Sequence, residues 1–599
     1  MNDDNRNLIA FIVMAALMLF AYEAYSYVFL EPAARQAART QAAARAAAPV
    51  ASASVKPGLT RAQALALSPR VAIDTPALSG SMSLKGARID DLFLKKYHLQ
   101  VSNTSPPVEL LRPEGMADAY FAEAGWVGAN LAGLPTKDTR WTLASGGALA
   151  PGRPVTLTYA APGGLTFTRR IDVDANAMFT LIDTVANGGA APASLSPYGS
   201  IKRLGLPEGL GKSGIVHEGA IGVLGVDHAD LKLSSYKDWK KKGEQDFASR
   251  GGWLGVTDKY WMTAFIPAQG ERFTASVRAA SLAEGPAAGG EAYEAAWIGT
   301  PNAIPAGGSI TRVTHLFAGA KTVPALKAYG RALGAPRFDD AVDWGHLWFL
   351  TKPIFLLLDF FYQHVGNFGV AILMLTVVIR LITFPLANSG FEMGVKMKKI
   401  QPELKALQAQ NKDDPAAQQK AMMALYAREK VNPVTGCLPI LFQIPVFYSL
   451  TKLFTVTIEM YHAPFFGWIH DLSARDPTTI VNLFGLIPWD PGMTPVIGGI
   501  LGGLLHVGVW PLAYGASMWL SQAMTPQTGI DPTQQALFRL MPLFFTFILA
   551  QYAVGLLIYW TWSSLITIIQ QYLMMRRHKV DNPIDSLLGR LRGPARAPG

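Results

Sequence analysis

Long apolar blocks separated by polar segments dominate the second half of this chain, and one further block opens it. A helix that spans a bilayer needs about 20 apolar residues. Six blocks are of about this length: residues 8–30, 365–388, 436–458, 496–524, 533–551 and 554–575. We therefore expect six transmembrane helices. Residues 1–30 are expected to be an uncleaved N-terminal anchor, with a cleaved signal peptide as the alternative.

A different pattern fills the region between the first two blocks. In residues 70–340, short runs such as residues 155–159 and 165–168 alternate apolar and polar side chains between Gly and Pro. This period of two predicts antiparallel strands, so we expect an all-β sandwich domain. Residues 31–69 are rich in Ala, Arg and Pro, which predicts a flexible linker. The lysines of residues 240–242 are expected to lie on a solvated loop.

Basic residues indicate the orientation of the predicted helices. Lys and Arg are frequent in residues 389–433 and in the tail, residues 576–599, whereas residues 459–495 hold only Arg475. Since positive loops stay in the cytoplasm, we expect the hairpin loop, the tail and the N-terminus inside. The β sandwich then lies outside, on the far side of the membrane.

Two further amphipathic segments flank the second block. Residues 345–364 are apolar and aromatic but carry charges, which is typical of a helix lying at the outer interface. Residues 389–433 are charged with apolar residues at helical spacing, and they predict a cytoplasmic helical hairpin. Methionine-rich faces suit adaptable apolar contacts, or the two faces pack on each other; these methionines are Met393, Met397, Met422 and Met423.

Composition supports a membrane protein and argues against catalysis. The chain is 50% hydrophobic and 16% charged. Its net charge of +10 gathers beside the apolar blocks, so it does not require nucleic acid as a partner. A single cysteine, Cys437, excludes an intramolecular disulfide. The sequence contains no His-Glu-x-x-His or Gly-x-Ser-x-Gly motif, and we expect no enzyme activity, no metal and no cofactor.

Arg380 is the only charged residue between Gly366 and Gly390. A guanidinium does not lose its proton, and placing it at the centre of a membrane helix costs roughly 2.5 to 3.5 kcal/mol. It either serves a function or extends its stem to the nearer interface. Thr376 and Thr383 lie on the same helical face, at i−4 and i+3.

Polar residues on the other predicted spans could meet Arg380. They either form hydrogen bonds between helices or line a hydrophilic groove. The last five predicted spans contain no Asp or Glu that could pair with Arg380, which favours a groove with water around the guanidinium. The candidate groove residues are Gln443, Ser521, Gln522, Tyr559, Trp560, Ser563 and Thr567.

These features occur together with motifs spread along the chain. The motifs are GARIDD at residues 86–91, YFAEAGW at 120–126, GGWLGVTDKYW at 251–261, Arg380 with Thr376, VNPVTGCLP at 431–439 with Gln443 and Pro445, and IIQQ at 568–571. In these residues the chain resembles the YidC family of membrane protein insertases, of the Gram-negative type with a large periplasmic domain.

The resemblance implies a membrane α-helical bundle with a five-helix core and a periplasmic β sandwich. It implies a groove that opens to the cytoplasm and to lipid, with Thr376 and Arg380 contacting the incoming protein. The tyrosine expected on the last span corresponds to Trp560, with Tyr559 beside it. An insertion around residues 482–498 lengthens the outer loop.

The implied partners are nascent membrane proteins, the Sec translocon, the ribosome and membrane lipids, without other nucleic-acid binding. Two other functions are left open by the residues themselves. A small-solute transporter would show internal repeats or broken helices, and we detect no repeat. A periplasmic binding module would use the β domain alone and treat the helices as a passive anchor.

Overall fold

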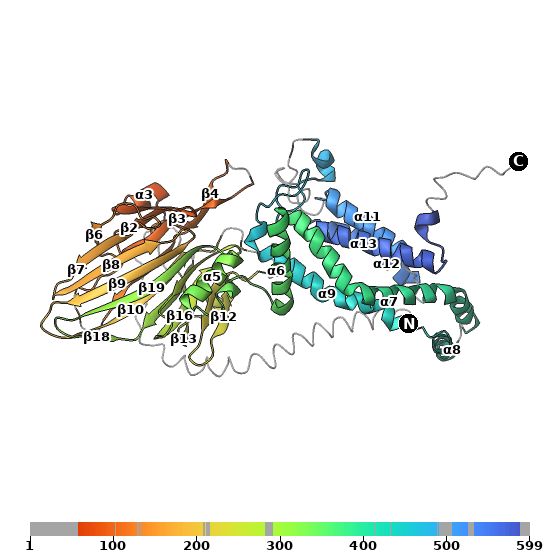
Figure 1. Cartoon of the computed structure of the whole chain (residues 1–599), viewed down its shortest axis with the longest axis horizontal. Coiled ribbons are helices and arrows are strands. Elements are labelled where there is room, and N and C mark those ends of the chain that lie inside the picture. Colours follow the sequence, from red (N-terminus) through yellow and green to blue (C-terminus); the bar gives the residue numbers. More distant parts are fainter. Residues whose placement is uncertain are drawn as a thin grey trace.

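The computed structural model describes the chain from residue 58 to residue 586, apart from short gaps. The gaps are residues 102–103, 129–130, 132, 208–209, 211–215, 282–290, 412–413, 432, 488, 490–505 and 525–531. The predicted N-terminal anchor, most of the predicted linker and insertion, and the end of the tail lie outside the described residues. Strands fill the first half of the described chain and helices the second (Figure 1).

Residues 70–342, which we call the β domain, form two antiparallel sheets packed as a sandwich. Strand β8 (Leu165–Val173) shows why, since its residues alternate between buried and accessible along the strand. The buried rows of the two sheets meet in one core, where the rings of Phe265 and Trp297 lie 6.5 Å apart. The predicted β sandwich is confirmed.

The described residues give one sheet of ten strands and one of nine. The ten-stranded sheet contains β1 (Arg70–Asp74), β2 (Leu78–Ser83), β3 (Arg88–His98), β4 (Pro107–Leu111), β5 (Tyr120–Val127), β10 (Ala193–Leu204), β13 (Gln245–Arg250), β16 (Arg272–Ser281), β17 (Glu291–Gly299) and β18 (Asn302–Ile304). The nine-stranded sheet contains β6 (Thr142–Ser145), β7 (Val155–Ala160), β8, β9 (Met178–Asn187), β11 (Gly219–Leu224), β12 (Asp230–Ser235), β14 (Trp253–Thr257), β15 (Trp261–Ile266) and β19 (Ser309–Ala320).

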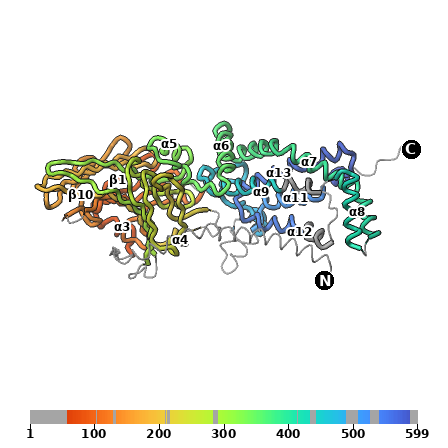
Figure 2. The backbone as a smooth tube through the Cα atoms, turned by 90° about the horizontal axis from the view of Figure 1, so that it is seen from below, coloured from red at the N-terminus to blue at the C-terminus, as the bar shows by residue number. Residues whose placement is uncertain are grey.

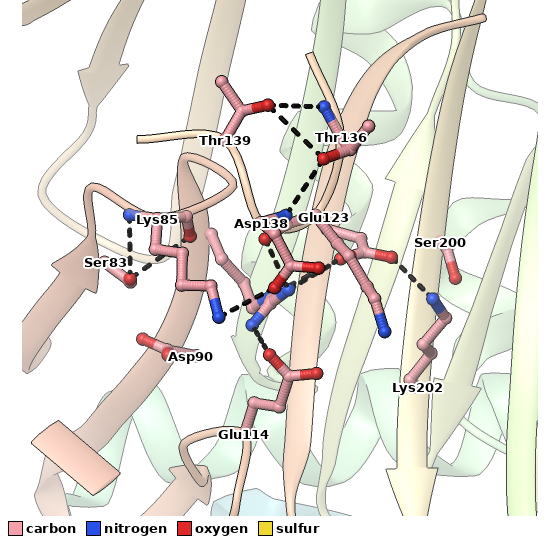
Figure 3. A network of polar contacts seen from close by, with 12 residues as sticks. Ser83, Lys85, Asp90, Glu114, Glu123, Thr136, Asp138, Thr139, Ser200 and Lys202 are labelled. Carbon is pink, nitrogen blue, oxygen red and sulfur yellow. Dashed lines mark hydrogen bonds and ion pairs between the residues drawn. The ribbon is translucent and has the colours of Figure 1, made fainter. Parts of the chain in front are cut away.

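The motif of residues 86–91 forms a buried ion-pair cluster in the β domain (Figure 3). The Arg88 side chain pairs with Glu114 and, at 3.2 Å, with Glu123. Glu123 also accepts a hydrogen bond from Lys202 Nζ at 2.6 Å. Each of these charges has an opposite charge beside it, so the cluster joins β3, β5 and β10 and leaves no free charge for a ligand.

Helices make up the rest of the described chain. In order, they are α3 (Arg61–Leu65), α4 (Tyr236–Lys242), α5 (Val323–Leu333), η3 (Phe338–Ala341), α6 (Trp348–Val365), α7 (Phe368–Gln410), α8 (Pro415–Arg428), α9 (Pro433–Val456), η4 (Ile458–Met460), η5 (Ile480–Gly485), α11 (Val509–Met524), α12 (Pro532–Leu549) and α13 (Val554–Arg577). Helix α13 packs against α7, α9 and α11. Helix α6 stands between the β domain and the other helices in both views (Figures 1 and 2).

One described helix, α7, has both the length and the hydropathy of a membrane span. Shorter apolar stretches occupy Leu441–Val456 and Arg539–Leu549. A bundle of helices is therefore observed where the later spans are expected. The count of six spans stays a prediction.

Helix α7 runs across the boundary predicted at residue 388 between the span and the hairpin. The helix continues without interruption past Pro385 and Pro402, although each proline removes one backbone hydrogen bond. Near the C-terminal end of α7, packing against α8 offsets the loss of the hydrogen bond at Pro402, because Ile400 and Leu404 are buried against Leu425. The predicted span and the first arm of the hairpin are thus one helix.

Two short helices replace predicted loops. Lys240–Lys242 end α4, which begins because the Ser235 hydroxyl accepts a hydrogen bond from the Asp238 N–H at 3.2 Å. Its residues Tyr236 and Trp239 are buried, so the lysines occupy the solvent side of a packed helix. The last residues of the predicted linker form α3, which pairs Arg61 with Asp91 of the β domain. The linker therefore becomes ordered before residue 69.

The β domain is fixed to the helical part by contacts close to the end of α9. Lys452 of α9 pairs with Asp343, and the hydroxyl of Tyr461 donates to the carbonyl of His98 at 2.8 Å. Glu459 accepts a hydrogen bond from the Val323 N–H at 2.8 Å. Because α5 has no side-chain cap of its own, this carboxyl caps the helix from the other part of the molecule.

Glu459 makes this docking sensitive to pH. Burial raises the pKa of Glu459 from its ordinary 4.5 to about 7, with Asp359 as a nearby like charge. An undocked carboxyl would ionise at lower pH, so the docked state holds an extra proton and docking weakens as pH rises between about 5 and 7. Glu459→Gln abolishes this titration. We expect its free energy of unfolding to exceed that of the wild type increasingly across this range, by on the order of 2 to 3 kcal/mol at the upper end, and its melting temperature to exceed that of the wild type accordingly.

The control for this comparison is Glu271→Gln, at an exposed glutamate of the β domain. The difference between its melting temperature and that of the wild type should be the same at every pH. A constant difference between Glu459→Gln and the wild type across the range would contradict the assignment.

Candidate functional site

Arg380 lies in the first third of α7, with its guanidinium turned toward Ser563 of α13. Its Nε donates to the Ser563 hydroxyl at 2.8 Å, and its Nη2 donates to the same oxygen. Ser563 is 3% exposed, whereas Arg380 is half-buried. Within the described part of the chain, no carboxylate pairs with Arg380, so its charge is solvated by a hydroxyl and not neutralised.

The two threonines predicted on the Arg380 face bond to their own helix. The Thr376 hydroxyl donates to the Ile372 carbonyl at 2.7 Å and is fully buried. The Thr383 hydroxyl donates to the Ile379 carbonyl at 3.0 Å and is half-buried. Thr383 thus lines the same side as Arg380, while Thr376 packs inside the bundle.

Gln443 and Tyr559 bring α9 to this site. The Gln443 Nε2 donates to the Tyr559 hydroxyl at 3.4 Å, one turn of α13 before Ser563. Tyr559 is buried. Arg380, Ser563, Tyr559 and Gln443 therefore form one polar group contributed by α7, α13 and α9. All four were predicted from the sequence.

The remaining predicted residues fall into other surroundings. The Thr567 hydroxyl donates to the Ser563 carbonyl at 2.9 Å. One turn further along α13, Gln571 accepts a hydrogen bond from the Ser521 hydroxyl of α11 at 3.5 Å. Gln522 is half-buried on α11. These side chains extend the polar face of α13 toward its C-terminal end.

Trp560 belongs to an aromatic cluster and not to the polar group. Its ring stacks on Phe447 at a centroid distance of 4.9 Å and an interplanar angle of 3°. Tyr514 and Tyr552 lie within 5.7 Å and 6.0 Å of the same ring. Of the two adjacent aromatic residues, Tyr559 is the one that reaches the Arg380 side.

A cavity of about 290 Å³ opens beside Arg380, between α7 and α13. Apart from Arg380, Asn388 and Gln570, its walls are apolar. Several of the wall residues are exposed although they are large and apolar; Leu381, for example, is 65% exposed. These residues were not predicted from the sequence, because apolar side chains that face a groove and apolar side chains that face lipid give the same hydrophobic pattern along a helix. They are Val377, Leu381, Phe384, Ile566, Ile569, Leu573 and Met574.

The methionines of the hairpin are divided between two environments. Met393, Met397 and Met422 pack on the buried core of the hairpin around Leu404. Met423 is 65% exposed. The two faces therefore pack mainly on each other, and Met423 is the methionine available to a partner.

The described residues contain no group of His, Cys, Asp or Glu that could hold a metal ion. The polar group also lacks a nucleophile with an adjacent base. What it provides is a fixed positive charge and several hydrogen-bonding groups next to an apolar opening.

Comparison with known proteins covers nearly the whole chain. The family model described as YidC periplasmic domain matches residues 70–357, and the one described as 60Kd inner membrane protein matches residues 360–582. The membrane protein insertase YidC of Caulobacter vibrioides is 52% identical over 99% of each chain, and that of Bradyrhizobium diazoefficiens is 42% identical over 97% of each. The solved structure of an active YidC insertase with its first transmembrane domain resolved shares 15% identity and a TM-score of 0.34, over 87% of this chain and 95% of that chain.

The different surroundings of Trp560 and Tyr559 give a direct test. Trp560→Ala removes a stacked, buried ring and should cost about 3 to 5 kcal/mol of stability. Tyr559→Phe removes one weak hydrogen bond, so it should cost about 1 kcal/mol or less while slowing insertion. Thermal unfolding in detergent and an insertion assay measure the two effects.

Trp562→Ala is the matched control, since this tryptophan is exposed on the same helix. It should leave the melting temperature unchanged. Equal destabilisation by Trp560→Ala and Trp562→Ala would refute the packing role of Trp560.

Proposed function

This chain belongs to the YidC family of membrane protein insertases, and from that premise we propose that Arg380 draws the polar part of a client protein into the membrane. Insertion of integral membrane proteins is the activity of the family, which is not one of enzymes. The chain accordingly works in the bacterial inner membrane, with a periplasmic domain in its first half. The insertase function replaces both alternatives raised by the sequence, the small-solute transporter and the binding module.

The observation that carries the proposal is the unneutralised charge beside the cavity. Arg380 is held by a hydroxyl at 2.8 Å and forms no ion pair in the described chain. A carboxylate partner would cancel most of its field, whereas a hydroxyl orients the guanidinium and leaves its charge available. The attraction exerted by a charge in a low-dielectric site is screened less than the attraction exerted by the same charge in water. An acidic or polar client segment is therefore attracted into the inner half of the membrane.

The apolar walls of the cavity serve the other part of the client. Leu381 and Phe384 on α7, with Ile569 and Leu573 on α13, are exposed toward the outside of the bundle. In the proposed mechanism, the hydrophobic segment of the client slides along these side chains into lipid, while its polar end stays near Arg380 and Gln443. A polar group of the client then crosses a shorter distance through hydrocarbon without solvation. The free-energy barrier to its translocation is therefore lower.

The rest of the proposed arrangement follows from the charges of the loops. We place six spans in the membrane, with both termini and the α7–α8 hairpin in the cytoplasm. The exposed Met423 and the basic tail are suited to contact nascent chains and the ribosome. The Sec translocon is the expected partner for larger clients.

Replacing Arg380 tests the electrostatic role. Arg380→Ala should slow insertion of a client with an acidic translocated segment by at least about tenfold, equivalent to about 1.4 kcal/mol. A client with a neutral segment should be affected less. Arg380→Lys keeps the charge and should retain most of the activity. The rates are measured with purified protein in reconstituted vesicles.

Lys396→Ala on the same helix is the control, because Lys396 is exposed beyond the groove. It should insert both clients at the wild-type rate. The mechanism is wrong if Arg380→Ala and Arg380→Lys both insert the acidic client normally.

A further inference from the structure

A second and larger cavity, of about 1010 Å³, lies where the β domain meets the helical part. One wall comes from β11, β12 and α4 of the β domain. The other comes from the residues that lead into α6 and from Tyr448 and Lys452 of α9. Its volume is at the upper end of the range of small-ligand sites. It is separate from the groove at Arg380.

The residues at the edge of the cavity are of the kinds that gather at a membrane boundary. Helix α6 starts at its edge with Trp348, which is 58% exposed, and continues with exposed Phe349 and Phe360. Tryptophan and tyrosine gather at the boundary between membrane and water, and Trp344 and Tyr448 also line the cavity. Since the β domain is periplasmic, this boundary belongs to the periplasmic leaflet.

Two of the three acidic residues that line the cavity lie in ion pairs. Asp343 pairs with Lys452, and Asp340 pairs with Arg337 at 2.6 Å and with Lys352. The third, Glu218, lies near the buried Lys321, whose Nζ donates to the Thr257 hydroxyl at 2.9 Å and to the Asp258 carbonyl at 2.7 Å.

Helix α4 places a positively charged side chain at the cavity. Lys237 is exposed at the cavity and has no ion-pair partner among the described residues. The cavity therefore presents an available cation to whatever enters it. An anionic group that enters the cavity can pair with Lys237.

An apolar wall stands beside this cation. Leu233 of β12 is 45% exposed on the β domain side, with Ile221 and Leu231 next to it in the lining. Trp348 provides an apolar surface on the membrane side. A small soluble anion would use Lys237 and leave the apolar side chains in water. A molecule with a phosphate at one end and acyl chains at the other would use both.

We propose that this cavity binds an anionic phospholipid of the periplasmic leaflet, with its phosphate at Lys237 and its glycerol and acyl chains along Leu233 and Trp348. The bound lipid fills the space between the β domain and α6. This role goes beyond insertion and does not depend on the groove. It uses residues of both parts of the molecule, so it also contributes to holding them together.

The test uses the full-length protein purified in detergent and titrated with phosphatidylglycerol, with bound lipid counted by native mass spectrometry. Lys237→Glu is compared with Lys241→Glu, which makes the same charge change at an exposed position of α4 that does not line the cavity. We expect Lys237→Glu to weaken binding about tenfold and Lys241→Glu to change it by less than about twofold. Equal binding by the two variants overturns the proposal.

Two further measurements identify the occupant. Leu233→benzoylphenylalanine, activated by light in phosphatidylglycerol vesicles, should add the mass of one lipid. Capture of a client segment instead would make the cavity a polypeptide site and overturn the proposal. Soluble glycerol phosphate should not compete with phosphatidylglycerol, because it lacks the acyl chains; effective competition would also overturn it.

Discussion

The bond between the Arg380 guanidinium and the Ser563 hydroxyl determines how the helical part can be arranged. A permanent positive charge in an apolar helix needs a polar partner, and α13 supplies a hydroxyl at 2.8 Å. The two helices are thereby held at one register. The Thr376 and Thr383 hydroxyls donate to carbonyls of α7 itself and do not alter this bond. The cavity opens beside the bond because the next residues along both helices are apolar and exposed.

Arginines of the β domain provide the contrast. Arg88 pairs with two glutamates, Arg169 with Asp183 at 2.6 Å, and Arg203 with Asp258 at 2.8 Å. Each is buried or nearly so, and each is neutralised, as expected where a charge serves the fold. Arg380 is half-buried and has no carboxylate partner among the described residues. The type of partner therefore distinguishes these three arginines, which are neutralised within the fold, from Arg380, whose charge is met by a hydroxyl.

The sequence predicted the components of the site better than their contacts. Helical periodicity placed Arg380 and Ser563 on polar faces of two helices, but the residues are 183 positions apart and no local pattern joins them. Tyr559 and Trp560 are neighbours on α13, so periodicity alone could not separate them. Stacking on Phe447 buries the tryptophan and leaves the tyrosine to the polar group.

Predictions about short segments failed for a related reason. The lysines of α4 look like a loop in the sequence, and the helix forms because Tyr236 and Trp239 are buried against distant strands. Alternation over the long strands, by contrast, identified the β sandwich correctly, since burial of one face leaves a local signal. The cavity between the β domain and α6 has no local signal, because its walls come from distant parts of the chain.

Helix α9 contacts both the Arg380 group and the segment that follows the β domain. Gln443 reaches the Arg380 group, and Lys452, nine residues later on the same helix, pairs with Asp343 of the segment that follows the β domain. The two contacts are separated by about 13 Å along one helix axis, at roughly 1.5 Å per residue. The helix runs unbroken between the two contacts, past Pro445. Helix α9 therefore joins the docking contacts of the β domain to the polar group at Arg380, although no residue of the β domain itself lies at Arg380.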